Sequence, residues 1–422
     1  MQVLKRIVLF FLVLGLFGCN NRLTDNRIAL PDKQQYDVID YDAINRSMRV
    51  ENALNVGVLL PLSGKASSIG QGMQNAMFMA LDDLKNNKLV LKFYDTKSTE
   101  SGAAEAAQKA IYEGAELILG PLMGEEVSSI SRTALSADIP VVSFTTSPQV
   151  LQKGVYSIGL LNGEQIERAI AYAASQGRNK LVLMVPNNNG GLNIVKSALM
   201  ATKAHGMSFK KVGFYNPNAM DFTTLVKEIS AGGDFDAVLV AESGNRLKSI
   251  VSMFAYNDIM YPNVLFIGTA SWDSTNLTKE TVIYHGVYPM VSKGYGNSYF
   301  SDKYYETFGE QPKPVYSFAY DSVLLASVLS NKSKDDLKAG ITSRGGFIGV
   351  NGFFRILPTG QSRHSLEMLE VTRDGPQVVS PADKRLADSA VEDIDIRYLT
   401  YDQLPKFYGK SSTEVLNWLN NN

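Results

Sequence analysis

Val56-Gly57-Val58-Leu59-Leu60-Pro61-Leu62-Ser63-Gly64 is the stretch of sequence that decides the fold of this chain. Its first part is an uninterrupted apolar run. The run ends at a turn, and a long segment rich in alanine and methionine follows. Continuous Val and Leu runs are typical of strands that are buried on both faces of a parallel sheet. The stretch therefore predicts the first strand of a parallel sheet and, near residues 70–86, the helix after it.

The same unit recurs along the chain. Apolar runs that end in polar or turn residues follow at 89–96, 115–121 and 140–144, and helical stretches lie between them at 100–112 and 125–137. This alternation predicts a parallel sheet connected by right-handed crossovers. Ligands of such sheets bind outside the carboxyl ends of the strands. We therefore expect the candidate site at the edge that carries Ser63, Leu122 and the segment from Ser143 to Thr146.

A second series of strands and helices follows the first, so the chain is of the α/β class with two lobes. Its expected strands are 180–185, 209–215, 237–241 and 264–268. Two such lobes imply a cleft between them, which is a common place for a ligand. We assign the N-terminal lobe to residues 54–160 plus about 290–340. The C-terminal lobe takes 161–289 plus about 341–378, and 379–422 form a C-terminal appendage.

The N-terminus has the pattern of an exported lipoprotein. Lys5 and Arg6 precede an apolar run, residues 7–17, that is too short for a reliable membrane span. The run ends in Leu16-Phe17-Gly18-Cys19, which resembles a bacterial lipobox and holds the only cysteine of the chain. We predict a lipoprotein signal peptide at 1–19, a lipid on Cys19 and a flexible tether at 20–53. The alternative is an ordinary signal peptide with a chance cysteine. Asn20, in place of an aspartate, favours the outer over the inner membrane.

Composition and motifs argue against several classes of function. A net charge of -1 gives no support for nucleic-acid binding, which needs a basic surplus. The three histidines are scattered outside any metal-ligand spacing, and no Gly-x-Ser-x-Gly elbow is present. We therefore expect no enzyme activity, no cofactor and no metal site.

The ordered motifs resemble the type I periplasmic-binding-protein superfamily over roughly residues 54–375. The resemblance implies a two-lobed fold in which each lobe is a parallel sheet flanked by helices, with hinge crossovers between the lobes. The motifs that carry it are Leu59 to Gly64, Ile118-Leu119-Gly120-Pro121, Pro140-Val141-Val142-Ser143, Tyr320-Asp321 and the glycine-rich segment from Gly346 to Gly352.

Two branches of that superfamily compete. Residues 59–84, 117–147 and 235–248 look closer to the penicillin-binding-protein activator lipoproteins, which implies a peptidoglycan synthase as partner in the cell envelope. The alternative is a leucine-binding-protein-like receptor for amino acids, which implies an ABC permease as partner and a small polar ligand in the cleft. Both branches place the protein in the periplasm.

The resemblance implies ligand-binding residues in the N-terminal lobe. In amino-acid receptors of this fold, hydroxyls and backbone N–H groups at helix N-termini hold the ligand carboxylate. Ser143, Thr145 and Thr146 occupy one such position, with Ser63 on the same edge; the alternative is that they cap a helix or a turn. The second hydroxyl is expected after Gly120-Pro121, where this chain has Leu122-Met123. That departure argues against an amino-acid receptor.

The C-terminal lobe offers further candidates. Asn187, with Asn188 and Asn189, lies in the loop 186–191 and is available to hydrogen-bond a polar ligand; the alternative is that this loop only forms a turn. Glu242 or Asp273 is available to pair with an ammonium group. Trp272 is available to stack on a ligand, or else to pack in the cleft wall or hinge.

Overall fold

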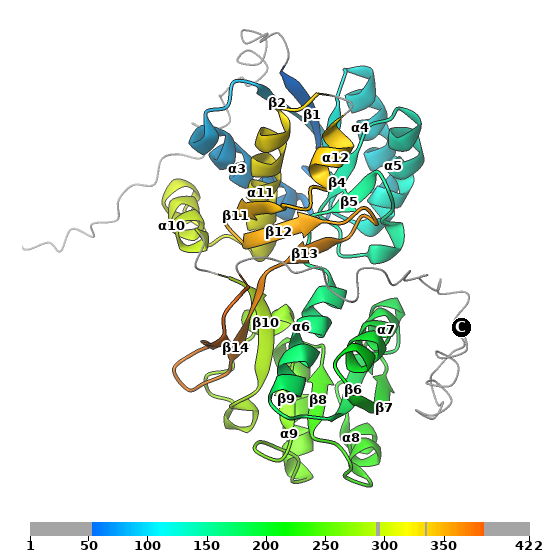
Figure 1. The fold of residues 1–422 in the computed structure, drawn as a ribbon, viewed down its shortest axis with the longest axis vertical. Coiled ribbons are helices and arrows are strands. Elements are labelled where there is room, and N and C mark those ends of the chain that lie inside the picture. The colour runs from blue at the N-terminus through cyan, green and yellow to red at the C-terminus, as the bar shows by residue number, and fades with distance from the viewer. Residues whose placement is uncertain (1–52, 293–295, 334–335, 384–422) are drawn as a thin grey trace, which may run out of the picture. The chain divides into compact units, whose positions relative to one another are not determined.

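The computed structural model describes residues 53–292, 296–333 and 336–383. Within these residues β1 (Leu54–Leu60) belongs to a five-stranded sheet with the order β2-β1-β3-β4-β5. Its other strands are β2 (Leu89–Asp95), β3 (Leu117–Leu119), β4 (Val141–Ser143) and β5 (Val155–Ser157). All neighbouring pairs in this sheet are parallel, which confirms the prediction. The carboxyl ends of β1, β3 and β4 therefore meet at one edge (Figure 1).

Helices cover both faces of this first sheet and complete the N-terminal lobe. On one face lie α3 (Ser67–Leu84) and α11 (Pro314–Leu329), and on the other α4 (Glu100–Tyr112) and α5 (Gly124–Ser136). The predicted Ala and Met stripe of α3 is buried, as shown by Met73, Ala76, Met77 and Ala80. Gly72 lets α11 approach α3 closely, because a Cβ at this position would lie 2.1 Å from the ring of Tyr316.

The C-terminal lobe is built on a seven-stranded sheet with the order β15-β14-β10-β9-β8-β6-β7. Its strands are β6 (Lys180–Pro186), β7 (Ser208–Tyr215), β8 (Ala237–Val240), β9 (Leu265–Ile267), β10 (Val287–Val291), β14 (Leu366–Glu370) and β15 (Gln377–Ser380). The part from β7 to β10 is parallel, and β14 and β15 are antiparallel additions. The helices α6 (Asn162–Ser175) and α7 (Asn189–Ala204) cover one face, and α8 (Thr223–Ser230) and α9 (Gly244–Tyr256) the other.

The late segments are distributed between the lobes differently from the predicted boundaries. α10 (Asn297–Phe308), α11 and α12 (Leu337–Ile341) accompany the N-terminal lobe. A third sheet of β11 (Phe347–Gly349), β12 (Gly352–Ile356) and β13 (Ser362–His364) also lies beside α11 and β5, although 341–378 were assigned to the other lobe. The Ser157 N–H donates to the Gly360 carbonyl at 2.8 Å, and the Ser362 hydroxyl donates to the Gly159 carbonyl at 2.6 Å. Of that range, β14 and the start of β15 belong to the seven-stranded sheet of the C-terminal lobe.

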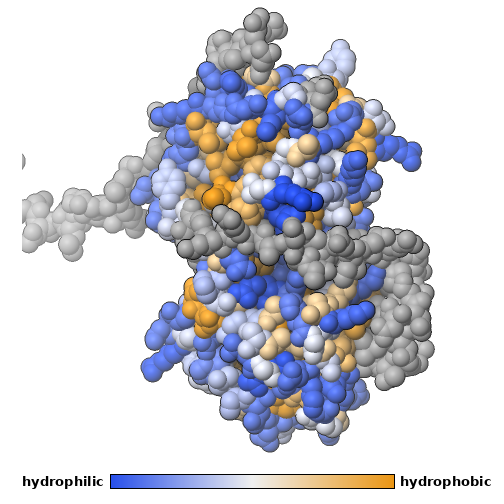
Figure 2. Space-filling view, in the orientation of Figure 1, coloured by the Kyte–Doolittle hydropathy of each residue, from blue (hydrophilic) through white to orange (hydrophobic). Residues whose placement is uncertain are grey.

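Several predicted segments lie wholly or largely outside the described residues. These are the signal peptide with Cys19, the tether and most of the appendage 379–422. Among the described residues, no helix has the length and apolarity needed to cross a membrane. Figure 2 shows a largely hydrophilic surface with a hydrophobic area on the N-terminal lobe, where α11 and β11 lie. Val328 and Ile348 are exposed apolar residues of these two elements.

Candidate functional site: a cavity between the two lobes

A cavity of about 600 Å³ lies between the two lobes. Its N-terminal wall is formed by the first turn of α5, by Glu100 at the start of α4 and by residues 146–150 after β4. Its C-terminal wall is formed by the start of α6 and by one side of α7 from Asn189 to Ala201, and residues 361–363 around β13 close one side. The volume is within the range of roughly 300–1,000 Å³ that is common for small-molecule sites.

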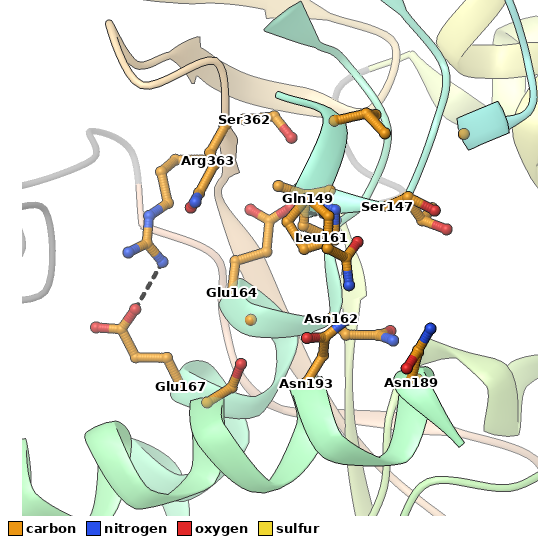
Figure 3. A pocket seen from close by; sticks show the side chains of 18 of the residues that line it. Ser147, Gln149, Leu161, Asn162, Glu164, Glu167, Asn189, Asn193, Ser362 and Arg363 are labelled. Atoms are coloured by element: carbon orange, nitrogen blue, oxygen red, sulfur yellow. Dashed lines mark hydrogen bonds and ion pairs between the residues drawn. The ribbon is translucent and has the colours of Figure 1, made fainter. Parts of the chain in front are cut away.

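Three asparagine side chains line the C-terminal wall. Asn162 and Asn189 are the first residues of α6 and α7, and Asn193 lies one turn further along α7. Asn188 fixes the start of α7, because its side-chain oxygen accepts a hydrogen bond from the Gly191 N–H at 3.0 Å. In Figure 3, Ser147 and Gln149 lie across the cavity from the three asparagines. Each amide offers donors and an acceptor, so this wall suits ligands that carry both.

The charge of the lining is negative. Glu100, Glu125, Glu164 and Glu167 contribute carboxylates, against the single guanidinium of Arg363. Arg363 is already engaged, since its Nη1 lies 2.6 Å from a carboxylate oxygen of Glu167 (Figure 3). Glu100 and Glu125 are exposed and form no ion pair with any other described residue. An anionic ligand is therefore repelled here, and a cationic group is attracted.

A buried polar cluster lies at the hinge beside the cavity. The Glu164 carboxylate accepts hydrogen bonds from the N–H groups of Leu161 at 3.0 Å and His364 at 2.6 Å, and it contacts His364 Nδ1 at 3.0 Å. The His364 ring packs between Phe318 and Phe354. This contact joins α6 of one lobe to β13, which lies beside the other lobe.

Asp321 of α11 lies in the same hinge region and is buried. Its carboxyl accepts hydrogen bonds from the Val350 N–H at 2.7 Å and from the Asn351 N–H and side-chain amide at 3.2 and 2.9 Å. Burial raises the pKa of this carboxyl to about 6, against the opposing effect of those hydrogen bonds. A side chain at Gly349 would collide with Asp321, because a Cβ there would lie 2.3 Å from the carboxyl carbon.

Comparison with protein families gives this site its context. The family model described as "Periplasmic binding protein" matches residues 53–376. The chain belongs to the periplasmic binding protein family. The parallel sheets with flanking helices match the type I fold of solved members. Family membership places the protein in the periplasm or cell envelope, and the family's solved relatives are solute-binding proteins.

Individual relatives are distant and divide between two functions. The leucine-binding protein LivK of Thermotoga maritima superimposes with a TM-score of 0.58 at 18% identity, covering 78% of this chain and 99% of its own. The Leu/Ile/Val-binding protein BraC3 of Rhizobium johnstonii is 22% identical over 42% of this chain and 52% of its own length. The penicillin-binding protein activator LpoA of Glaesserella parasuis is 25% identical over 56% of this chain and 42% of its own. The chain thus spans about half the length of the curated relatives that it matches.

Most of the predicted N-terminal ligand residues of this periplasmic binding protein make internal hydrogen bonds. Thr146 lines the cavity, as does its neighbour Ser147. The Ser63 hydroxyl donates to Asp95 at 2.6 Å, and the Ser143 hydroxyl donates to the Tyr156 carbonyl at 2.8 Å. The Thr145 hydroxyl accepts a hydrogen bond from the Ser147 N–H at 3.1 Å. This bond stabilises a turn, which was the alternative to a ligand contact at this residue.

The predicted C-terminal ligand residues lie away from the cavity. Glu242 accepts hydrogen bonds from the Tyr215 hydroxyl at 2.6 Å and from Arg246 Nε at 3.2 Å. Trp272 is fully buried, and its indole N–H donates to the Val240 carbonyl at 3.0 Å, so neither face of its ring is open to stack on a ligand. Asp273 accepts from the Tyr288 hydroxyl at 3.0 Å. Asn187 precedes the residues of its loop that line the cavity, Asn189 and Gly190.

Sequence reasoning missed Asn162 and Asn193. Asn162 begins α6 and Asn193 lies within α7, and an asparagine near the start of a helix is usually assigned to a cap or a turn. The available signal was their position in or beside the first turn of a helix that follows a strand or a crossover, where side chains face the cleft. Among the described residues, no group of three or more His, Cys, Asp or Glu side chains is arranged to hold a metal ion.

Proposed function

We propose that this periplasmic binding protein is a non-catalytic, lipid-anchored regulator of the cell envelope, similar to the penicillin-binding-protein activators. In this proposal Cys19 carries the lipid, the outer membrane is the anchoring membrane, and a peptidoglycan synthase is the partner. The similarity to two LpoA proteins supports this role. The exposed apolar residues Val328 and Ile348 are consistent with it, since contact with a partner needs such surface.

One observation favours this role over an amino-acid receptor. The Glu242 carboxylate, the expected partner of a ligand ammonium, is held by Tyr215 and Arg246. Burial, the hydrogen bond to Glu242 and its negative charge raise the pKa of the Tyr215 hydroxyl, so this hydroxyl stays a donor. An ammonium group would have to displace Arg246, and the positions after Gly120-Pro121 offer no side-chain hydroxyl for a carboxylate.

The second candidate is an amino-acid-type receptor of an ABC transporter. The cavity between the lobes and the fold shared with LivK favour it. In that case a ligand would stabilise a closed arrangement of the lobes, which an ABC permease would recognise.

Two measurements on the full chain separate these functions. We expect addition of the chain to a purified bifunctional peptidoglycan synthase to raise its rate of glycan polymerisation or peptide cross-linking. We expect no free amino acid to raise the melting temperature, because ligand binding to the native state must raise it. An amino acid that raises the melting temperature, together with an unchanged synthase rate, would establish the receptor instead.

A further inference from the structure

A second hollow adjoins the cavity between the lobes on the side of α5. That hollow has a volume of about 640 Å³ and is lined by one side of α5 together with residues 149–152. Ser128, Gln149 and Val150 line both spaces, so the two spaces lie next to each other along α5. We call the two spaces together the α5 trough. It offers more room than the cavity alone, and its long direction is that of α5.

One face of α5 forms the floor of the trough. Glu125, Ser128, Arg132 and Leu135 recur at spacings of three and four residues, which places them on the same face of a helix. Glu125 and Arg132 are exposed, and neither forms an ion pair with another described residue. They are seven residues apart, which corresponds to about 10 Å along a helix axis. The floor therefore carries a negative charge at one end and a positive charge about 10 Å away.

The walls of the trough add to the difference in charge between its two ends. At the Glu125 end, Glu100 adds a second carboxylate with no ion-pair partner among the described residues. These two full charges outweigh the positive end of the α5 dipole, which is worth roughly half a unit charge. The amides of Asn162, Asn189 and Asn193 line the cavity that holds Glu100 and Glu125, and they offer donors and acceptors. At the Arg132 end, Leu135 and Leu151 provide apolar surface.

We infer that the α5 trough binds a short peptide in an extended form, with its amino group at Glu100 and Glu125 and its terminal carboxylate at Arg132. An extended chain advances about 3.4 Å per residue, so a separation of about 10 Å corresponds to three to four residues. The amides of the wall pair with the peptide backbone. A free amino acid carries both charges on one carbon and reaches only one end. The inference rests on the proposed function, for which it names the class of ligand.

The test is calorimetric titration of the full chain with tetra-alanine, whose two charged ends match the trough. We expect tetra-alanine to bind, di-alanine to bind at least about fivefold more weakly and alanine to show no binding, because neither shorter molecule can span both charges. Glu125→Gln should weaken tetra-alanine about fivefold but leave N-acetyl-tetra-alanine unchanged. Arg132→Gln should weaken tetra-alanine to a similar extent but leave the C-terminal amide unchanged.

Matched controls are available on exposed residues outside the trough. Glu306→Gln and Arg344→Gln remove the same charges there and should change nothing. Equal affinity for alanine and tetra-alanine, no binding of tetra-alanine, or binding that ignores both trough variants would overturn the inference. Synthase stimulation without peptide binding overturns the peptide site alone. Peptide binding without synthase stimulation overturns the proposed function and leaves the peptide site standing.

Discussion

At the scale of single residues, Asp321 predicts how stability depends on pH. Burial raises the pKa of its carboxyl from 3.8 to about 6 in the folded chain. Between these values the unfolded chain releases the proton while the folded chain keeps it, so rising pH favours unfolding. Above about pH 6 this carboxyl has lowered the free energy of unfolding by its full amount, up to about 3 kcal/mol. Asp321→Asn should remove this decrease in stability with rising pH, whereas the exposed control Asp302→Asn should retain it. Urea unfolding from pH 4 to 7 measures both, and parallel curves for the wild type and Asp321→Asn would contradict the assignment.

At the scale of elements, the start of α6 depends on the Glu164 carboxylate. It caps α6 through the Leu161 N–H and binds both the N–H and the ring of His364, so three interactions are lost or weakened together in Glu164→Gln. We expect a loss of about 2–3 kcal/mol in the free energy of unfolding. Glu167→Gln, one turn further along the same helix, weakens only the partly buried hydrogen bond with Arg363 and should cost about 1 kcal/mol. Urea unfolding at pH 7 ranks the two, and a larger loss for Glu167→Gln would show that the cap is unimportant.

The sequence alone predicts some of these elements and not others. The strands and helices of both series follow from local patterns, since continuous apolar runs identify buried strands and a stripe such as that of α3 identifies a buried helix face. The third sheet could not be assigned in this way. Its place depends on contacts such as His364 with Glu164 and Val350 with Asp321, which join residues far apart in the chain. The hydrogen bonds of Glu242 and Trp272 could not be predicted from the sequence for the same reason, because they connect separate elements.

At the scale of the whole molecule, ligand binding should act on both lobes together. The chain passes between the lobes three times, from β5 to α6, from β10 to α10 and from β13 to β14. A ligand that contacts both walls of the cavity therefore stabilises the arrangement in which the walls are close. Saturating tetra-alanine should slow amide hydrogen exchange in the first turns of both α5 and α7, because closure reduces local opening on each side. The distant helix α9 serves as the internal control and should exchange at an unchanged rate. In Glu125→Gln the protection of α5 and α7 should fall in parallel at a fixed peptide concentration, since one binding event produces both. Protection confined to α5 would mean that the peptide occupies one lobe without closing the cavity.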